Sequence, residues 1–204
     1  MTAAALLALW AIHLAAVVSP GPAFVLCLRT GASEGFRAGA GVALGLALGV
    51  VVWAAATMAG LALLFQVAPW LFVGFKSAGA RVPLWSALGM WRPAAAALPD
   101  AGAGAAPRGL LSAVSLGFLT NVTNPKTAVF FGAIFVGLVP ADLPLRERGL
   151  ILAILFGNEV VWDALVARVF SLRPARAAYG RVKAGLDRLF GGLIALLGLR
   201  IALT

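Results

Sequence analysis

The sequence has few charged residues and almost none of the residues that bind metals or form disulfides. Only 11% of its 204 residues are charged, whereas soluble domains have about a quarter. Cys27 is the only cysteine, which excludes an intrachain disulfide and any metal site with several thiolates. His13 is the only histidine, which excludes a site with several imidazole ligands. We therefore expect neither a metal site nor a cofactor.

The remainder is strongly apolar, because 62% of the residues are hydrophobic. The net charge of +9 fits basic residues in cytoplasmic loops and not nucleic-acid binding, because no basic tract with interleaved aromatics lies apart from the apolar segments. No Lys or Arg precedes Arg29, so we expect the apolar start to be a retained span and not a secretory signal. Six apolar segments have about the length, roughly 20 residues, that a helix needs to cross a bilayer, or more. They are approximately 3–28, 38–65, 70–91, 109–138, 149–168 and 187–203.

The segments predict an all-α membrane protein of two inverted three-helix repeats, in which helices one and four are broken. An Ala/Gly/Pro-rich stretch at 93–107 resembles a linker. It leaves three segments on either side, and an odd number inverts the second half relative to the first. We expect one transporter domain over 1–204, with repeat halves of about 1–92 and 108–204. Lys and Arg gather in the first, third and fifth connections, which places those connections in the cytoplasm and both termini outside it.

Glycines recur at every fourth position of the second segment, at Gly41, Gly45 and Gly49. Small residues at this spacing let two helices approach closely in lipid. The pattern therefore predicts, above all, that this segment packs closely against another helix.

The first apolar segment is interrupted by Ser19-Pro20-Gly21-Pro22. Each proline removes an N–H group and disfavours a continuous helix. In a bilayer, a broken helix persists only where it lines a cavity or is buried in protein. The half-helix that follows would direct its N-terminal amides at the break and favour an anion there. A simple proline kink is the alternative interpretation.

The fourth segment is interrupted by Asn121-Val122-Thr123-Asn124-Pro125-Lys126. Asn121 and Asn124 can cap or bridge freed backbone groups, and Pro125 stops the helix. Lys126 adds a positive charge, and an intramembrane lysine is a functional candidate by default. The alternative is a lysine that reaches back to the cytoplasmic face. Broken helices in both halves point to a transporter's substrate site.

The fifth segment contains Asn158, Glu159 and Asp163. Glu159 and Asp163 are spaced i, i+4 and share one helix face. Two carboxylates in apolar surroundings cannot both be comfortably ionised, which suits proton coupling or the binding of a substrate ammonium. The alternative is a structural ion pair with Lys126, or with a cation of the third segment.

These motifs resemble the LysE/RhtB family of amino-acid exporters. The Ser-Pro-Gly-Pro element is followed by Arg29 and a Gly-rich stretch, and the Asn-Pro-Lys element is followed by Phe130-Phe131. The resemblance implies proton-driven efflux of amino acids or similar metabolites across the bacterial inner membrane, and no enzyme activity. The third segment departs from the family, because Arg81-Val82-Pro83-Leu84 stands where family members have a tyrosine region. The residues there that fit are Lys76, Gly79, Ala80, Leu88, Gly89 and Arg92.

Three classes of function compete on these residues. In an amino-acid exporter, the half-helix N-termini and Lys126 hold the carboxylate, and Asp163 or Glu159 holds the ammonium and exchanges protons. An ion or metal transporter would have few soft ligands here. An intramembrane enzyme would need a nucleophile and a base, and His13 has no evident partner. We expect the exporter, with a small molecule and lipid as partners, and a homodimer because so short a chain makes a thin-walled pathway.

Overall fold

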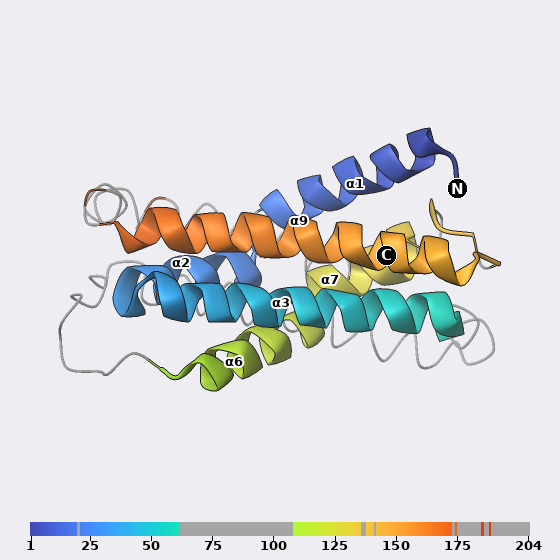
Figure 1. Ribbon diagram of the computed structural model, residues 1–204. Coiled ribbons are helices and arrows are strands. Elements are labelled where there is room, and N and C mark those ends of the chain that lie inside the picture. Colours follow the sequence, from blue (N-terminus) through green and yellow to red (C-terminus); the bar gives the residue numbers. More distant parts are fainter. Residues whose placement is uncertain are drawn as a thin grey trace.

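A computed structural model describes residues 1–19, 21–61, 108–135, 138–140 and 142–172, together with positions 174, 185 and 188. Every regular element in these ranges is helical (Figure 1), as the sequence predicts. The third predicted segment and the linker lie outside the described residues, as does the sixth segment apart from position 188.

The described chain forms six α-helices and two π-helical turns, η1 and η2, and their bounds follow the interruptions in the apolar segments. In chain order they are α1 (Ala3–Val18), α2 (Pro22–Glu34), α3 (Phe36–Ala56), η1 (Thr57–Leu61), α6 (Leu110–Val122), α7 (Pro125–Val129), η2 (Phe130–Phe135) and α9 (Leu145–Ser171).

Helices α1 and α2 form a bent pair, with 60° between them, which has the geometry of a broken span or of a re-entrant loop. The amino group of Met1 contacts Glu147 near the start of α9. Just after α2, the Phe36 ring lies 5.6 Å from the Arg168 guanidinium near the end of α9. These two points on α9 are about 30 Å apart at 1.5 Å per residue. The pair therefore runs the length of α9 (Figure 1).

The second broken segment also extends between the two ends of the molecule. Arg108, next to the start of α6, forms an ion pair with Glu34 at the end of α2, with 2.7 Å between the closest N and O atoms. At the other end of the segment, Phe135 of η2 packs in one cluster with Leu143 and Ile151, beside the start of α9. Helices α6 and α7 with η2 thus connect the same two ends of the molecule as α1 and α2.

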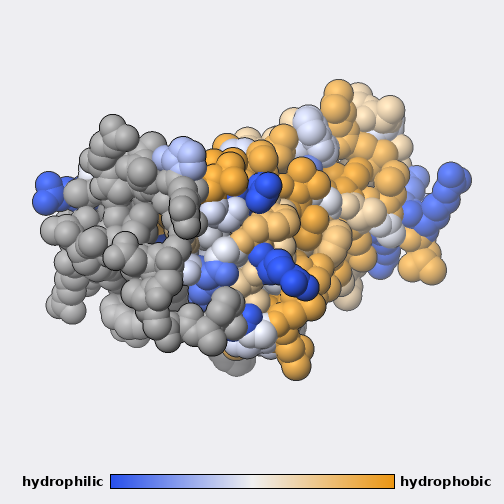
Figure 2. Space-filling view, turned by 60° about the vertical axis from the view of Figure 1, so that its left-hand side comes forward, coloured by the Kyte–Doolittle hydropathy of each residue, from blue (hydrophilic) through white to orange (hydrophobic). Residues whose placement is uncertain are grey.

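Two helices are long and apolar enough to cross a bilayer unbroken. They cover Phe36–Gly60, which is α3 with most of η1, and Leu145–Ser171, which is α9. With the bent pair α1–α2, the described residues hold up to three candidate spans. The face shown in Figure 2 carries broad apolar patches, as expected of a surface that meets lipid. Exposed apolar side chains include Leu7, Val52, Leu119, Val161 and Leu165.

Two apolar clusters of different character fill the interior. One contains Trp53 and the three phenylalanines Phe130, Phe131 and Phe135. The other is built from smaller residues such as Ala23, Cys27 and Ala113. Buried polar side chains also lie in the interior. Among the described residues they are His13, Thr30, Thr57, Asn121, Asn124, Thr127, Asn158, Glu159 and Asp163.

The predicted glycine contact is confirmed and joins α3 to α6. A Cβ atom on Gly45 would lie 2.0 Å from the carbonyl oxygen of Val114, and one on Gly117 would lie 2.1 Å from that of Val42. A side chain has no room at either position. The backbones of α3 and α6 are therefore in direct contact, as small residues permit in membrane helices.

Candidate functional site

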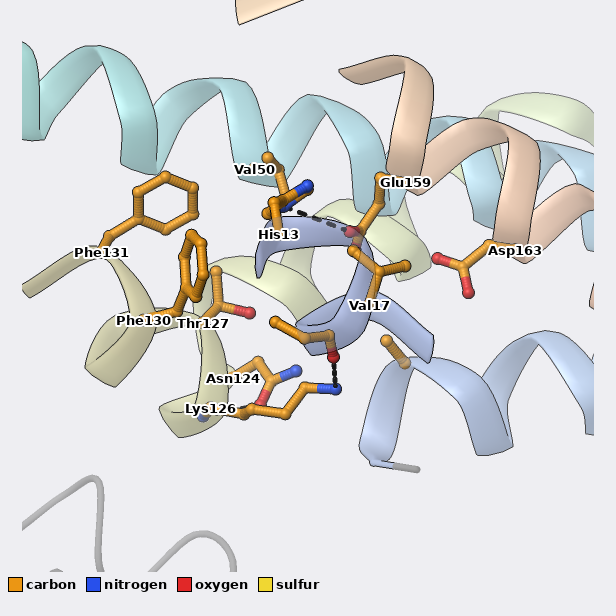
Figure 3. Close-up of a pocket in the computed structure, with 12 residues that line it drawn as sticks. His13, Val17, Val50, Asn124, Lys126, Thr127, Phe130, Phe131, Glu159 and Asp163 are labelled. Atoms are coloured by element: carbon orange, nitrogen blue, oxygen red, sulfur yellow. Dashed lines mark hydrogen bonds and ion pairs between the residues drawn. The ribbon is translucent and has the colours of Figure 1, made fainter. Parts of the chain in front are cut away.

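A small cavity lies where the two broken helices meet, and side chains from α1, α2, α3, α7, η2 and α9 line it (Figure 3). Its volume is about 30 Å³, which is room for about two water molecules. The polar side chains that line it are His13, Asn124, Lys126, Thr127, Glu159 and Asp163.

The first break brings backbone groups, and no capping side chain, to the site. Gly21 precedes α2 in an extended conformation, with no side-chain hydrogen bond to the first turn, and Pro22 begins the helix. The Ser19 hydroxyl donates to the Ala16 carbonyl at 2.8 Å. Pro20, also predicted as a site residue, lies outside the described residues.

The second break is capped by its own residues. Asn124 lies before α7 and its Oδ1 accepts a hydrogen bond from the backbone N–H of Lys126 at 3.0 Å. Pro125 takes the first helical position, where its missing N–H costs nothing. The indole N–H of Trp53 donates to the Val122 carbonyl at 3.2 Å. The predicted capping role of Asn124 is confirmed.

Lys126 connects the two breaks. Its Nζ donates to the Ala16 carbonyl at 2.9 Å, to the Ser19 carbonyl at 2.8 Å and to the Ser19 hydroxyl at 3.3 Å. The side chain therefore reaches the C-terminal end of α1. An ion pair of Lys126 with Glu159 or Asp163 is not found among the described residues, and Lys76 and Arg81 lie outside them.

Glu159 and Asp163 are both buried on α9 but differ in their partners. Glu159 Oε1 accepts a hydrogen bond from Asn121 Nδ2 at 2.9 Å, and its Oε2 lies 3.9 Å from His13 Nε2. Asp163 is 1% exposed, and its Oδ2 has no hydrogen-bond partner among the described residues. The prediction that Asn121 caps or bridges the break is thus corrected, because its amide binds a carboxylate of α9.

His13 and Asn158 belong to the site, although the sequence did not single them out for it. Asn158 Nδ2 lies 3.0 Å from the Trp10 carbonyl oxygen and 3.3 Å from His13 Nδ1. The His13 ring also meets Phe130 edge to face, with 5.2 Å between centroids. A lone histidine in an apolar segment was the available signal, but its partner lies 145 positions away in the sequence.

The cavity has a basic group on one wall and two acidic groups on another. The Lys126 ammonium lies on one side, and the Glu159 and Asp163 carboxylates approach from α9 on the other (Figure 3). Such an arrangement can hold a molecule with one negative and one positive group. Among the described residues, no group of three His, Cys, Asp or Glu is placed to hold a metal ion.

Comparison with known proteins gives consistent results. Residues 14–204 match the family described as LysE type translocator. The chain is 29% identical over 199 residues to the threonine efflux protein of Salmonella typhi, covering 95% of each chain. The same figures hold for the threonine efflux protein of Escherichia coli (strain K12). The homoserine/homoserine lactone efflux protein of Salmonella typhi is 29% identical over 190 residues, covering 91% of this chain and 89% of that one. No solved structure matches the chain.

Proposed function

Because the chain belongs to the LysE family of translocators, we propose that it is a secondary transporter that exports an amino acid or similar metabolite across the bacterial inner membrane. Its relatives include proteins named for threonine efflux and for homoserine efflux. The protein is a membrane translocator and not an enzyme.

The observation that carries this proposal is the charge arrangement of the cavity. An amino acid at neutral pH has a carboxylate and an ammonium on neighbouring atoms. The cavity offers one cation, Lys126, and two carboxylates, Glu159 and Asp163. Buried charges in a membrane require partners, and a zwitterion supplies a partner to each wall. A simple inorganic ion would satisfy only one of them.

We assign the substrate carboxylate to Lys126 and the first turn of α2. Lys126 now donates to the carbonyls of Ala16 and Ser19, which are neutral acceptors. A carboxylate is a stronger acceptor for an ammonium donor. The amides after Gly21 and Pro22, which lack a side-chain cap, face the same region and favour an anion. Binding would then replace carbonyl contacts of Lys126 with charged ones.

We assign the ammonium and the proton to the two acids of α9. Within the part of the chain that the structure describes, Asp163 Oδ2 is buried without a hydrogen-bond partner, so an ionised Asp163 lacks the compensation there that burial demands. A proton, or a substrate ammonium nearby, supplies that compensation. Alternation between the two is a means of coupling efflux to a proton gradient.

The inverted-repeat architecture is part of the proposal. When the sequence is aligned on itself with Pro20 opposite Pro125, α1 corresponds to α6, and α2 corresponds to α7 with η2. Helix α3 corresponds to the first part of α9. The packing is reciprocal, because α3 packs on α6 and α9 packs on α1. Such a relation supports alternation of a central site between two faces. We extend it to halves of 1–92 and 108–204 and to six spans.

The same contacts support the proposed orientation. The Glu34–Arg108 pair joins the first and third connections at one end, which the basic residues assign to the cytoplasm. The Met1–Glu147 contact joins the N-terminus to the fourth connection at the other. A reporter inserted at Gly104 should score cytoplasmic, and an external score contradicts this topology. Crosslinking in native membranes tests the proposed homodimer.

Transport assays test the function directly. Cells that overproduce the protein should survive toxic concentrations of a subset of amino acids or analogues, and purified protein in proteoliposomes should move the same compounds. Transport of metal or inorganic ions without any amino acid would contradict the proposal and favour an ion transporter.

The coupling residue is tested in the same proteoliposomes with an imposed pH gradient. Asp163→Asn should retain downhill exchange but lose uphill transport, because an amide cannot carry the proton. Uphill transport by this variant would exclude Asp163. The parallel assay on Glu159→Gln then decides whether either acid carries the proton.

A further inference from the structure

His13 occupies a position that the substrate-binding scheme does not use. It is 2% exposed and lies in the penultimate turn of α1. One ring nitrogen faces Asn158 and the other faces Glu159. An otherwise apolar segment thus carries a single imidazole whose two nitrogens both meet α9.

The hydrogen bonds around Asn158 assign the tautomer of this imidazole. The Trp10 carbonyl can only accept a hydrogen bond, so the atom of Asn158 that lies 3.0 Å from it must be the amide nitrogen and not the oxygen. That nitrogen has two N–H groups. The second is directed to His13 Nδ1 at 3.3 Å. Nδ1 therefore accepts, and in the neutral ring the proton lies on Nε2.

The assigned proton is directed at Glu159. His13 Nε2 and Glu159 Oε2 are 3.9 Å apart, which is longer than a hydrogen bond. A shift of less than 1 Å would bring the two atoms within hydrogen-bonding distance. The other oxygen of the carboxylate already accepts from Asn121 at 2.9 Å. Donors from both broken helices, α1 and α6, thus face the two oxygens of one carboxylate. Asp163, one turn further along, has a buried oxygen to which none of the described residues donates.

We propose that His13 is a positioning residue whose neutral Nε2–H tautomer, fixed by Asn158, orients Glu159 and keeps it ionised. Glu159 is then the acid that receives the substrate ammonium, and Asp163 is left to carry the proton. The charged groups that share the cavity with His13 are Glu159 and Asp163 from α9 and Lys126 from α7. The assignment of the ammonium rests on the proposed function, whereas the tautomer does not.

The tautomer can be measured without any substrate. His13 is the only histidine in the chain, so histidine labelled with nitrogen-15 gives signals from this ring alone. In lipid nanodiscs at neutral pH, we expect a protonated Nε2 and an unprotonated Nδ1. Asn158→Leu should lose this preference and give a mixture of tautomers. An Nδ1–H tautomer or an imidazolium in the wild-type protein would overturn the proposal.

Two matched substitutions test the consequence for transport. His13→Gln reaches the position of Nε2 and retains a donor toward Glu159, whereas His13→Asn reaches only the position of Nδ1. We expect KM for efflux to rise about tenfold in His13→Asn, with a similar maximal rate, and to stay within about threefold in His13→Gln. Uphill transport on a pH gradient should persist in His13→Gln.

The outcomes separate the two proposals. Equal losses in both variants at normal protein level would show that the ring only fills space, and loss of uphill transport in His13→Gln would make His13 the proton carrier. Either result overturns the positioning role. If the wild-type protein moves no amino acid, the proposed function fails, and the nitrogen-15 spectrum still decides the tautomer.

Discussion

The first break, before α2, and the second, before α7, satisfy their freed backbone groups by different means. The second break has its own side-chain cap, Asn124, and a further donor from Trp53 on α3. The first has no side-chain cap on α2. The carbonyls of Ala16 and Ser19 are held by Lys126, which belongs to the second break.

This difference predicts that the first break is more mobile than the second. Substrate would compete for the ammonium of Lys126. The Ser19 carbonyl would then lose this donor in a dry environment, whereas the Ala16 carbonyl would keep the Ser19 hydroxyl as a donor. We therefore expect the first break to rearrange when substrate binds or leaves, and the second to keep its Asn124 cap throughout. Substitutions at the two breaks test this contrast.

The largest expected effect is that of Lys126→Ala. It removes hydrogen bonds to two carbonyls of the first break and the proposed partner of the substrate carboxylate. We expect efflux to fall about a hundredfold or more, with membrane insertion intact, and Lys126→Arg to retain part of the activity because it keeps the charge. Normal efflux by the alanine variant at normal protein level would show that Lys126 does not bind the substrate. It would also contradict the proposed difference between the two breaks.

A smaller effect is expected at Asn124, which acts within the second break. Loss of a helix N-cap costs about 1 kcal/mol, so Asn124→Ala should lower the melting temperature in detergent and reduce efflux about tenfold. Asn124→Ser should restore most of both, because serine also caps well. Equal behaviour of the two variants would show that the break does not depend on its own cap.

The smallest effect is expected from Gly21→Ala. The added Cβ would lie 3.3 Å from Lys126 Nζ, and Gly21 has an extended backbone, so only the flexible end of the lysine must shift. We expect efflux to fall about threefold. Gly149→Ala is the matched control, since nothing lies within 4 Å of a Cβ there. A Gly21→Ala variant as active as this control would indicate that the carbonyl contacts of Lys126 do not matter.

Local chemistry made several features predictable from the sequence. Pro22 and Pro125 removed N–H groups, and both mark helix starts. Spacing alone placed Gly45 on a packing face and put Glu159 and Asp163 one turn apart. Helical class and the positions of the breaks therefore followed from residues close together in the chain.

Partners across the molecule were not predictable in the same way. The acceptors of Lys126 lie about 110 positions earlier in the chain, and the donor to Glu159 is Asn121, which sequence reasoning assigned to the break itself. His13 meets Asn158 only because α1 packs beside α9. Such contacts depend on the rotation of each helix about its axis and on the closeness of packing, which apolar periodicity leaves undetermined in a lipid-exposed helix.

The direct backbone contact between α3 and α6 has a consequence for the evolution of this protein. At Gly45 and Gly117 even one methyl group would collide with a main-chain carbonyl, so selection should reject every replacement there, whatever compound is transported. The walls of the cavity are under no such absolute restriction. On the proposed function, we expect homologues with other substrates to differ at cavity residues such as Val17, Val50 or Thr127 and to keep both glycines.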